Sequence, residues 1–310
     1  MSDEIERIAR ASEGLTVCGA PEGFDALVFC DAARLRGGVS LFIAADEARA
    51  SAFDQACAFF APDLGRLRLP AWDCQPYDRI SPSPRAAARR AGALHRLATR
   101  GEDAGPLIVI ATVNGVIQRC APREAMGEGG LAASAGGVLD ADDLKRYLSL
   151  NGYTRASTVT ERGDYAVRGG VFDVFPADAD EPVRLDFFGD TLETVRAFDP
   201  ETQRTTRQLK AARFTPVSEI MLDEDSISRF RSGFLKRFGG GVQGDPIYDS
   251  VSAGARPNGA EHWLPLFHER LDTVFDYVGE GALIGLDPLA RDARDERESQ
   301  ISDYYEARQD

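Results

Sequence analysis

The chain lacks the features of a membrane or secreted protein. No apolar run approaches the about 18–20 residues that a bilayer-spanning helix needs. The N-terminal segment, MSDEIERIAR, is charged and has no apolar stretch of the kind found in signal peptides. We therefore predict a cytoplasmic protein that makes no contact with a membrane.

Cysteine is scarce, and the cysteines have no C-x-x-C spacing. This excludes a disulfide framework and a zinc site, and it indicates reduced thiols. Two of them fall in apolar runs, which predicts that Cys18 and Cys30 are buried on core strands. The full set is Cys18, Cys30, Cys57, Cys74 and Cys120.

Positive charge is also in deficit. The chain has 36 Lys and Arg against 50 Asp and Glu, so its formal net charge is −14. This excludes general affinity for nucleic acid, although a local basic face can still exist within an acidic average. A length of 310 residues, of which 43% are hydrophobic, predicts two or three folded domains and excludes wholesale disorder.

The first 124 residues alternate between apolar runs of strand length and segments with helical spacing. This alternation predicts an α/β domain with a largely parallel sheet. We expect strands at 15–18, 26–30, 39–44 and 107–111, and helices at 46–60 and 84–100.

A second segment, 125–214, has a different pattern. A stretch rich in Gly, Ala and Ser at 124–137 is typical of a linker, and Asp140 is placed to cap a following helix. The period then changes to two, which predicts a small antiparallel α+β domain. Its expected strands are 171–175, 183–188, 192–198 and 207–214.

The last segment, 215–310, returns to helical spacing at 225–238 and to a short apolar run at 282–286. We expect it to complete the first α/β domain. The charged stretch 287–310 has no apolar end, which is typical of a cut inside a longer polypeptide.

A nucleotide site is expected to be degenerate. A P-loop needs a Lys followed by Ser or Thr, whereas the turn here reads Gly19-Ala-Pro-Glu-Gly23-Phe24-Asp25. Its Glu22 and Asp25 bring negative charge to where a phosphate would lie. At the end of the last apolar run Asp287 stands alone before a proline, which is typical of a turn or cap. We therefore predict no nucleotide binding and no metal.

Other catalytic patterns are missing from the sequence. The three histidines, His95, His262 and His268, have no metal-ligand spacing, and we expect the last two to be packing or surface residues. There is no G-x-S-x-G elbow. We predict no catalytic residue.

Arginines gather in two places. The first group surrounds the helix expected at 84–100, where a solvated face and a DNA-binding face both fit the pattern. The second lies in the antiparallel segment, where Arg184, Asp186 and Phe188 share one strand face. An exposed Arg beside an exposed Phe is typical of a protein–protein contact. The two groups are Arg79, Arg85, Arg89, Arg90, Arg96 and Arg100, and Arg162, Arg168, Arg184, Arg196 and Arg204.

Five segments closely resemble the N-terminal part of bacterial transcription-repair coupling factors, the Mfd family: LPAWDCQPYDRISPSP (69–84), IATVNGVIQR (110–119), RGDYAVRGGVFDVFP (162–176), VRLDFFGD (183–190) and FDPETQR (198–204). In that family this region is similar to the excinuclease subunit UvrB. The resemblance implies a degenerate, helicase-like parallel-sheet domain, split by an inserted small antiparallel α+β domain that binds UvrA. The family's docking positions fall on Arg168, Arg184 and Phe188.

The resemblance also implies what lies outside this chain. In the family, domains C-terminal to this region bind RNA polymerase and double-stranded DNA, and an ATP- and Mg-dependent motor displaces the stalled polymerase. This chain would then be a non-catalytic adaptor for nucleotide excision repair, without a cofactor of its own. The alternative is an ATP-dependent DNA helicase or a UvrB-type lesion-binding module that uses the 79–100 region.

Overall fold

The computed structural model describes residues 2–21, 23–77, 80–101, 103–242 and 244–307, and the chain forms two compact units. The parallel-sheet unit consists of Met1–Ala71, Thr99–Arg119 and Asp272–Asp310. The antiparallel-sheet unit consists of Trp72–Ala98 and Cys120–Leu271. The expected mixed α/β class, with one parallel and one separate antiparallel sheet, is confirmed. The split UvrB-like arrangement, with domains 1–124, 125–214 and 215–310, stays a prediction.

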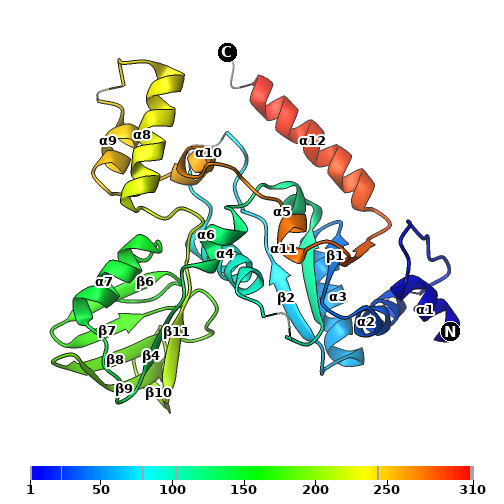
Figure 1. Cartoon of the computed structure of the whole chain (residues 1–310), viewed down its shortest axis with the longest axis horizontal. Coiled ribbons are helices and arrows are strands. Elements are labelled where there is room, and N and C mark those ends of the chain that lie inside the picture. The colour runs from blue at the N-terminus through cyan, green and yellow to red at the C-terminus, as the bar shows by residue number, and fades with distance from the viewer. Residues whose placement is uncertain (1, 22, 78–79, 102, 243, 308–310) are drawn as a thin grey trace. The chain divides into compact units, whose positions relative to one another are not determined.

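The parallel-sheet unit is built on four strands in the order β12-β1-β3-β2, all parallel (Figure 1). The apolar runs predicted β1, β3 and β12. No strand was expected at β2, which is short and in which arginines alternate with leucines. The strands are β1 (Val39–Ala44), β2 (Gly65–Leu69), β3 (Leu107–Thr112) and β12 (Leu283–Leu286).

One face of this sheet is covered by α2 and α3. Phe29 of α2 meets Phe42 of β1 edge to face, with ring centroids 5.7 Å apart, and Phe53 of α3 stacks on Phe42. The helices are α1 (Ser2–Ala9), which packs on α2, α2 (Phe24–Arg36), α3 (Glu47–Phe60), α5 (Val113–Ile117), α11 (Val274–Val278) and α12 (Ala290–Glu306). Asp46 caps α3 by accepting a hydrogen bond from the backbone N–H of Arg49 at 2.8 Å.

Two expected strands are wrong. Residues 15–18 form no strand and their side chains are exposed, so Cys18 is exposed rather than buried. Residues 26–30 lie in α2, where Ala26, Phe29, Cys30 and Ala33 are buried at helical spacing. The apolar run is part of a longer pattern of period 3.6, and a short run alone does not distinguish a strand from a buried helix. Cys30 is buried, as expected.

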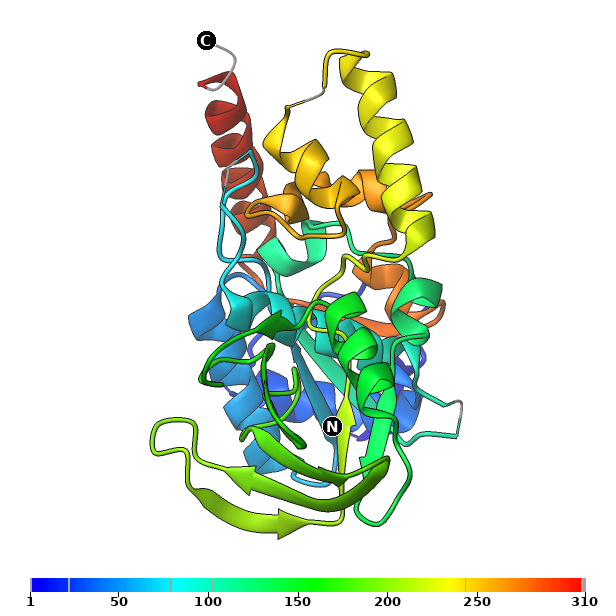
Figure 2. The same ribbon diagram turned by 90° about the vertical axis from the view of Figure 1, so that its left-hand side faces the viewer.

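The main sheet of the antiparallel-sheet unit has six strands in the order β10-β9-β8-β7-β6-β5, and among the described residues of this sheet only β5 and β6 pair in parallel. Figure 2 shows these strands (green to yellow-green) as a curved sheet. Helix α7 (Ala141–Leu150), capped by Asp140 as predicted, buries Leu144 and Leu148 in the same apolar core as the strands. The strands are β5 (Thr154–Arg155), β6 (Asp164–Arg168), β7 (Val171–Val174), β8 (Val183–Phe188), β9 (Thr191–Phe198) and β10 (Thr205–Leu209).

A second small sheet pairs β4 (Leu131–Ser134) with β11 (Ala211–Phe214). The single strand expected at 207–214 is therefore wrong: it divides between two sheets, with Lys210 between β10 and β11. The expected linker at 124–137 contains β4, because a partner strand 80 residues away completes its hydrogen bonds.

The remaining helices of this unit are α4 (Pro84–Ala98), α6 (Arg123–Gly127), α8 (Glu224–Phe238), α9 (Pro246–Ser252), α10 (Leu264–Phe267) and the 3-10 turn η1 (Ala260–Trp263). An aromatic cluster joins α8, α9 and α10 around Phe230, Phe234 and Phe267. Both tryptophans of the chain, Trp72 and Trp263, pack against this cluster.

Candidate functional site

The outer face of the antiparallel sheet carries the predicted docking residues. Strand register places Asp173 of β7 and Arg196 of β9 on either side of Arg184 of β8. Because alternate residues of a strand share a face, Arg184, Asp186 and Phe188 point away from the core that Leu185 occupies. The alternation continues past the register shift between Asp186 and Phe187, because Phe187 packs against the core and Phe188 is exposed.

Arg184 is tied to a buried carboxylate. Its Nε and Nη2 donate to the two carboxylate oxygens of Asp173 at 2.6 and 2.8 Å, and its guanidinium lies 4.8 Å from the ring centroid of Phe198. The hydrogen bonds that Arg184 donates to Asp173 are the main reason that the pKa of Arg184 is raised. Only 19% of the Arg184 side chain is exposed. The expectation of an exposed arginine at this position is therefore wrong.

Arg168 and Phe188 are solvent-exposed residues of this face. Arg168 donates to the backbone oxygen of Ser157 at 2.6 Å, and its Nη1 lies 3.7 Å from Asp173, yet 55% of its side chain is exposed. Phe188, the last residue of β8, is 76% exposed. We call Arg168, Arg184, Asp173 and Phe188 the docking face.

Asp173 is the residue that sequence reasoning missed. It is almost fully buried and is shared by two arginines. A signal was present in the sequence, since an Asp inside the apolar run Val-Phe-Asp-Val-Phe has to be paired if the strand is buried. Arg196, by contrast, is paired with Asp186 at 2.6 Å.

Arg162 lies apart from the docking face. Its guanidinium stacks 5.0 Å from the ring centroid of Phe175, and its Nη2 lies 3.3 Å from Asp180. Arg204 precedes β10 and is exposed.

The degenerate nucleotide turn has a definite geometry. Gly19 and Gly23 have φ angles of 79° and 84°, which only glycine adopts readily, and Gly23 precedes Phe24, the first residue of α2. Glu22 lies outside the described residues. Asp25 in the first turn of α2 and Asp287 after β12 both bind Arg49 of α3, the latter at 2.6 Å.

Arg49 therefore joins two carboxylates that are far apart in sequence. Asp287 is only 5% exposed, and its second oxygen accepts from the backbone N–H of Leu289, so it is both an ion-pair partner and a turn cap. Burial alone would lower the pKa of Arg49, but Asp25 and Asp287 raise it. The guanidinium also lies 5.5 Å from the ring centroid of Phe42.

Replacing Arg49 by alanine is expected to destabilise the parallel-sheet unit by about 3 kcal/mol, because Asp287 would stay buried without its cation. Arg49→Lys should cost less, because it keeps one charge at the site. Far-UV circular dichroism during urea unfolding measures the loss. Tryptophan fluorescence is the internal control, since Trp72 and Trp263 both belong to the other unit. A midpoint for Arg49→Ala equal to that of the wild type would contradict the assignment.

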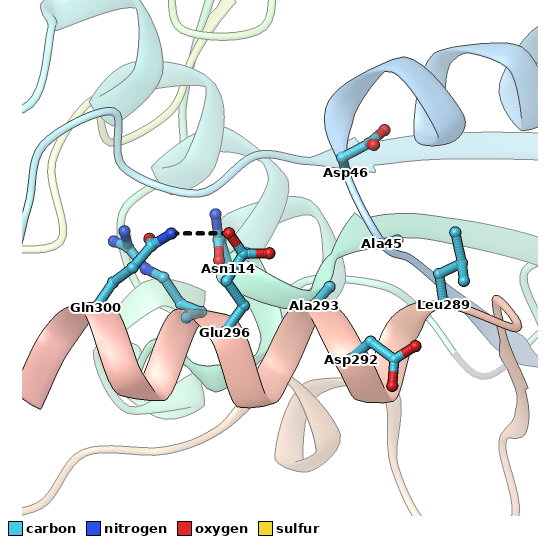
Figure 3. A pocket seen from close by; sticks show the side chains of 9 residues that line it. Ala45, Asp46, Asn114, Leu289, Asp292, Ala293, Glu296 and Gln300 are labelled. Atoms are coloured by element: carbon cyan, nitrogen blue, oxygen red, sulfur yellow. Dashed lines mark hydrogen bonds between the residues drawn. The ribbon is translucent and has the colours of Figure 1, made fainter.

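A cavity of about 350 Å³ lies in the parallel-sheet unit, beside α12 and the residues that follow β1 and β3. Figure 3 shows Asp46, Asp292 and Glu296 among its lining residues, with Gln300 donating to Glu296. A triphosphate placed here would meet three carboxylates against the single guanidinium of Arg297, which is electrostatically unfavourable.

Helix α4 places its arginines in different environments. Arg90 is fully buried and donates through Nε to Glu219 at 3.0 Å and through Nη2 to Cys120 at 3.1 Å. Arg85, Arg89 and Arg96 are exposed, whereas Arg100 follows the helix and belongs to the parallel-sheet unit. Arg79 lies outside the described residues.

Two of the histidines, His262 and His268, are half-buried and lie against backbone carbonyl groups. A ring nitrogen of His262 lies 2.9 Å from the carbonyl oxygen of Ile80, and one of His268 lies 2.8 Å from that of Glu219. Burial lowers the pKa of His268. Within the described ranges, no cluster of His, Cys, Asp and Glu has the form of a metal site. Nor is any described helix long and apolar enough to cross a membrane.

The segment that contains the docking face is similar to a known domain family. Residues 131–220 match the UvrB interaction domain family, and this span contains β4 to β11.

Relatives that match most of the chain show that it belongs to the transcription-repair-coupling factor family. It is 35% identical over 217 residues to that of Haemophilus influenzae (69% of this chain, 18% of the relative) and 35% identical over 221 residues to that of Escherichia coli (70% and 19%). It is 28% identical over 270 residues to that of Rickettsia bellii (87% and 24%). The resemblance inferred from the sequence is confirmed, and the chain spans at most about a quarter of the length of these relatives.

Proposed function

We propose that this chain recruits UvrA through the docking face, with Arg168, Arg184 and Phe188 as the contact residues. The UvrB interaction domain match and the similarity to transcription-repair-coupling factors support this role. On the docking face Arg168 and Phe188 are exposed, whereas Arg184 is held against Asp173.

The observation that carries the proposal is the exposure of Phe188 on the sheet face that also bears two arginines sharing one carboxylate. Two guanidinium groups against one buried Asp leave a net positive charge, which suits an acidic side chain on the partner. A large exposed aromatic ring on the same face is typical of an interface hot spot.

We further propose that the chain is a non-catalytic adaptor. In the proposed whole protein, other domains bind RNA polymerase and double-stranded DNA, and a separate motor uses ATP and Mg. Two features support this proposal. In the nucleotide turn, the residue after Gly23 is Phe24 and not a Lys. Asp25 of this turn and Asp287 after β12 both form ion pairs with Arg49.

Titration of purified UvrA onto the fluorescently labelled chain tests the proposal. We expect saturable binding, whereas a flat titration would refute UvrA recruitment. A parallel titration with a fluorescent ATP analogue separates the adaptor from the helicase alternative, because the adaptor is expected to give no saturable signal. Saturable ATP binding by this chain would refute its non-catalytic character.

A further inference from the structure

The end of the antiparallel sheet that carries Phe188 has a second exposed apolar side chain. Val138 lies four residues after the end of β4 and forms an antiparallel bridge with Thr191, the first residue of β9. Thr191 pairs on its other side with Phe188, the last residue of β8. Three neighbouring segments therefore place Val138, Thr191 and Phe188 in one line across the sheet, which we call the apolar row.

The side chains of the apolar row point to the same side of the sheet, because residues directly opposite each other in antiparallel pairs share a face. Leu139, which follows Val138, packs against the apolar core of the sheet, so Val138 points away from that core. Phe187 packs against the same core, so Phe188 points outward as well. Val138 thus lies on the docking face.

Val138 and Phe188 are the most exposed large apolar side chains that the structure describes in the antiparallel-sheet unit, at 82% and 76%. Single exposed apolar residues are ordinary on a protein surface, whereas neighbouring ones are typical of an interaction site. Adjacent strands lie about 4.8 Å apart, so these two residues are separated by roughly 10 Å. One apolar side chain of a partner, placed over Thr191, can therefore contact both.

The backbone on both sides of Val138 is held by hydrogen bonds. The N–H of Leu192 donates to the carbonyl oxygen of Gly137 at 2.9 Å. The N–H of Leu139 donates to the carbonyl oxygen of Asp190, also at 2.9 Å. The valine side chain itself is β-branched and has few rotamers. Because backbone and side chain are already ordered, little conformational entropy is lost when a partner covers Val138.

We propose that Val138 is a further contact residue for UvrA and that the apolar row receives an apolar side chain of that partner. This inference rests on the proposed recruitment of UvrA through the docking face. Strand register places Arg168 and Arg184 level with earlier residues of β8 than Phe188. The matching surface of UvrA then has an acidic side chain and an apolar side chain next to each other.

Titration of UvrA onto the fluorescently labelled chain tests the proposal with two variants of Val138. Val138→Ala removes two methyl groups from the contact and should weaken binding about tenfold. Val138→Ile keeps a β-branched apolar side chain and should bind within about threefold of the wild type.

Salt separates an apolar contact from an electrostatic one. The loss caused by Val138→Ala should be the same at about 50 mM and about 300 mM salt, because burial of apolar surface is not screened. The loss caused by Arg168→Gln should become smaller at the higher salt concentration.

Val17→Ala is the matched control, because it makes the same deletion at a valine that is 54% exposed in the parallel-sheet unit. We expect unchanged UvrA affinity for this variant. Thermal melts check the fold, and the exposed position of Val138 predicts an unchanged midpoint for Val138→Ala.

The outcomes separate this inference from the proposed function. Wild-type affinity of Val138→Ala, together with weakened binding by Phe188→Ala, would overturn the role of Val138 and leave UvrA recruitment intact. A Val138→Ala loss that disappears at the higher salt would also overturn it, and so would a wild-type dimer that Val138→Ala dissociates, because the row would then bind a second copy. A wild type that does not bind UvrA would refute recruitment itself, and the role of Val138 with it.

Discussion

Phe188→Ala is expected to weaken UvrA binding at least about 30-fold, as is typical of an aromatic hot spot worth about 2 kcal/mol. Because the ring is 76% exposed in the free chain, its removal should change the free energy of unfolding by less than about 0.5 kcal/mol. UvrA titration by anisotropy measures the first effect, and a thermal melt measures the second.

Phe59→Ala is the matched control for this experiment. Phe59 is 79% exposed and lies on α3 of the parallel-sheet unit, outside the docking face. We expect unchanged UvrA affinity for this variant. Equal affinities of wild type and Phe188→Ala would remove Phe188 from the docking face.

Arg184→Ala is a less specific probe, for a structural reason. It would leave Asp173 buried with only Arg168 nearby, so the fold would be weakened together with the contact. Arg168→Gln removes charge from a half-exposed position instead. Loss of UvrA binding by Arg168→Gln with an unchanged melt would therefore separate a contact from a stability effect.

Arg90→Ala is expected to lower the free energy of unfolding of the antiparallel-sheet unit by about 3–5 kcal/mol. Arg90 is fully buried, and its partner Glu219 is 4% exposed, so the substitution leaves an uncompensated charge in the core. Urea unfolding followed by tryptophan fluorescence measures the loss, because Trp72 and Trp263 both lie in this unit.

The double variant Arg90→Met/Glu219→Gln controls for the buried charge. Glu219 also accepts from the backbone N–H of Ala121 at 2.9 Å, and glutamine keeps an acceptor there. Replacing a buried ion pair by neutral groups is often nearly neutral, so we expect at least half of the lost stability to return. A loss below about 1 kcal/mol for Arg90→Ala would show that the pair is not a structural anchor.

Local patterns predicted many of the elements well. The run at 39–44 is β1, the run at 183–188 is β8, and the helix after Asp140 is α7 with its cap. These elements follow from side-chain period and capping chemistry, which act within a few residues. The errors arose where a segment distant in sequence determines the secondary structure. Strand β4 is an example, because its partner β11 lies far along the chain.

At the candidate sites too, local patterns predicted some features, and contacts between distant segments determined the others. The sequence indicated that Arg168, Arg184 and Phe188 belong to one sheet, and spacing placed Arg184 and Phe188 on one face. It did not show that Asp173 holds the side chain of Arg184 in a mostly buried position, because this contact forms only when β7 pairs with β8.

The amino-acid sequence by itself determined the charge balance, the absence of a P-loop lysine, the period of each sheet and the family resemblance, because these depend only on residue type and spacing. The tertiary structure decided which arginines are exposed to solvent and can contact a partner. Arg49 reaches Asp287 across 238 residues and Arg90 reaches Glu219 across 129, and each pair removes an arginine from the surface. Burial makes such pairing necessary, since an unpaired charge in the core is costly, and only the fold determines which charges are buried together.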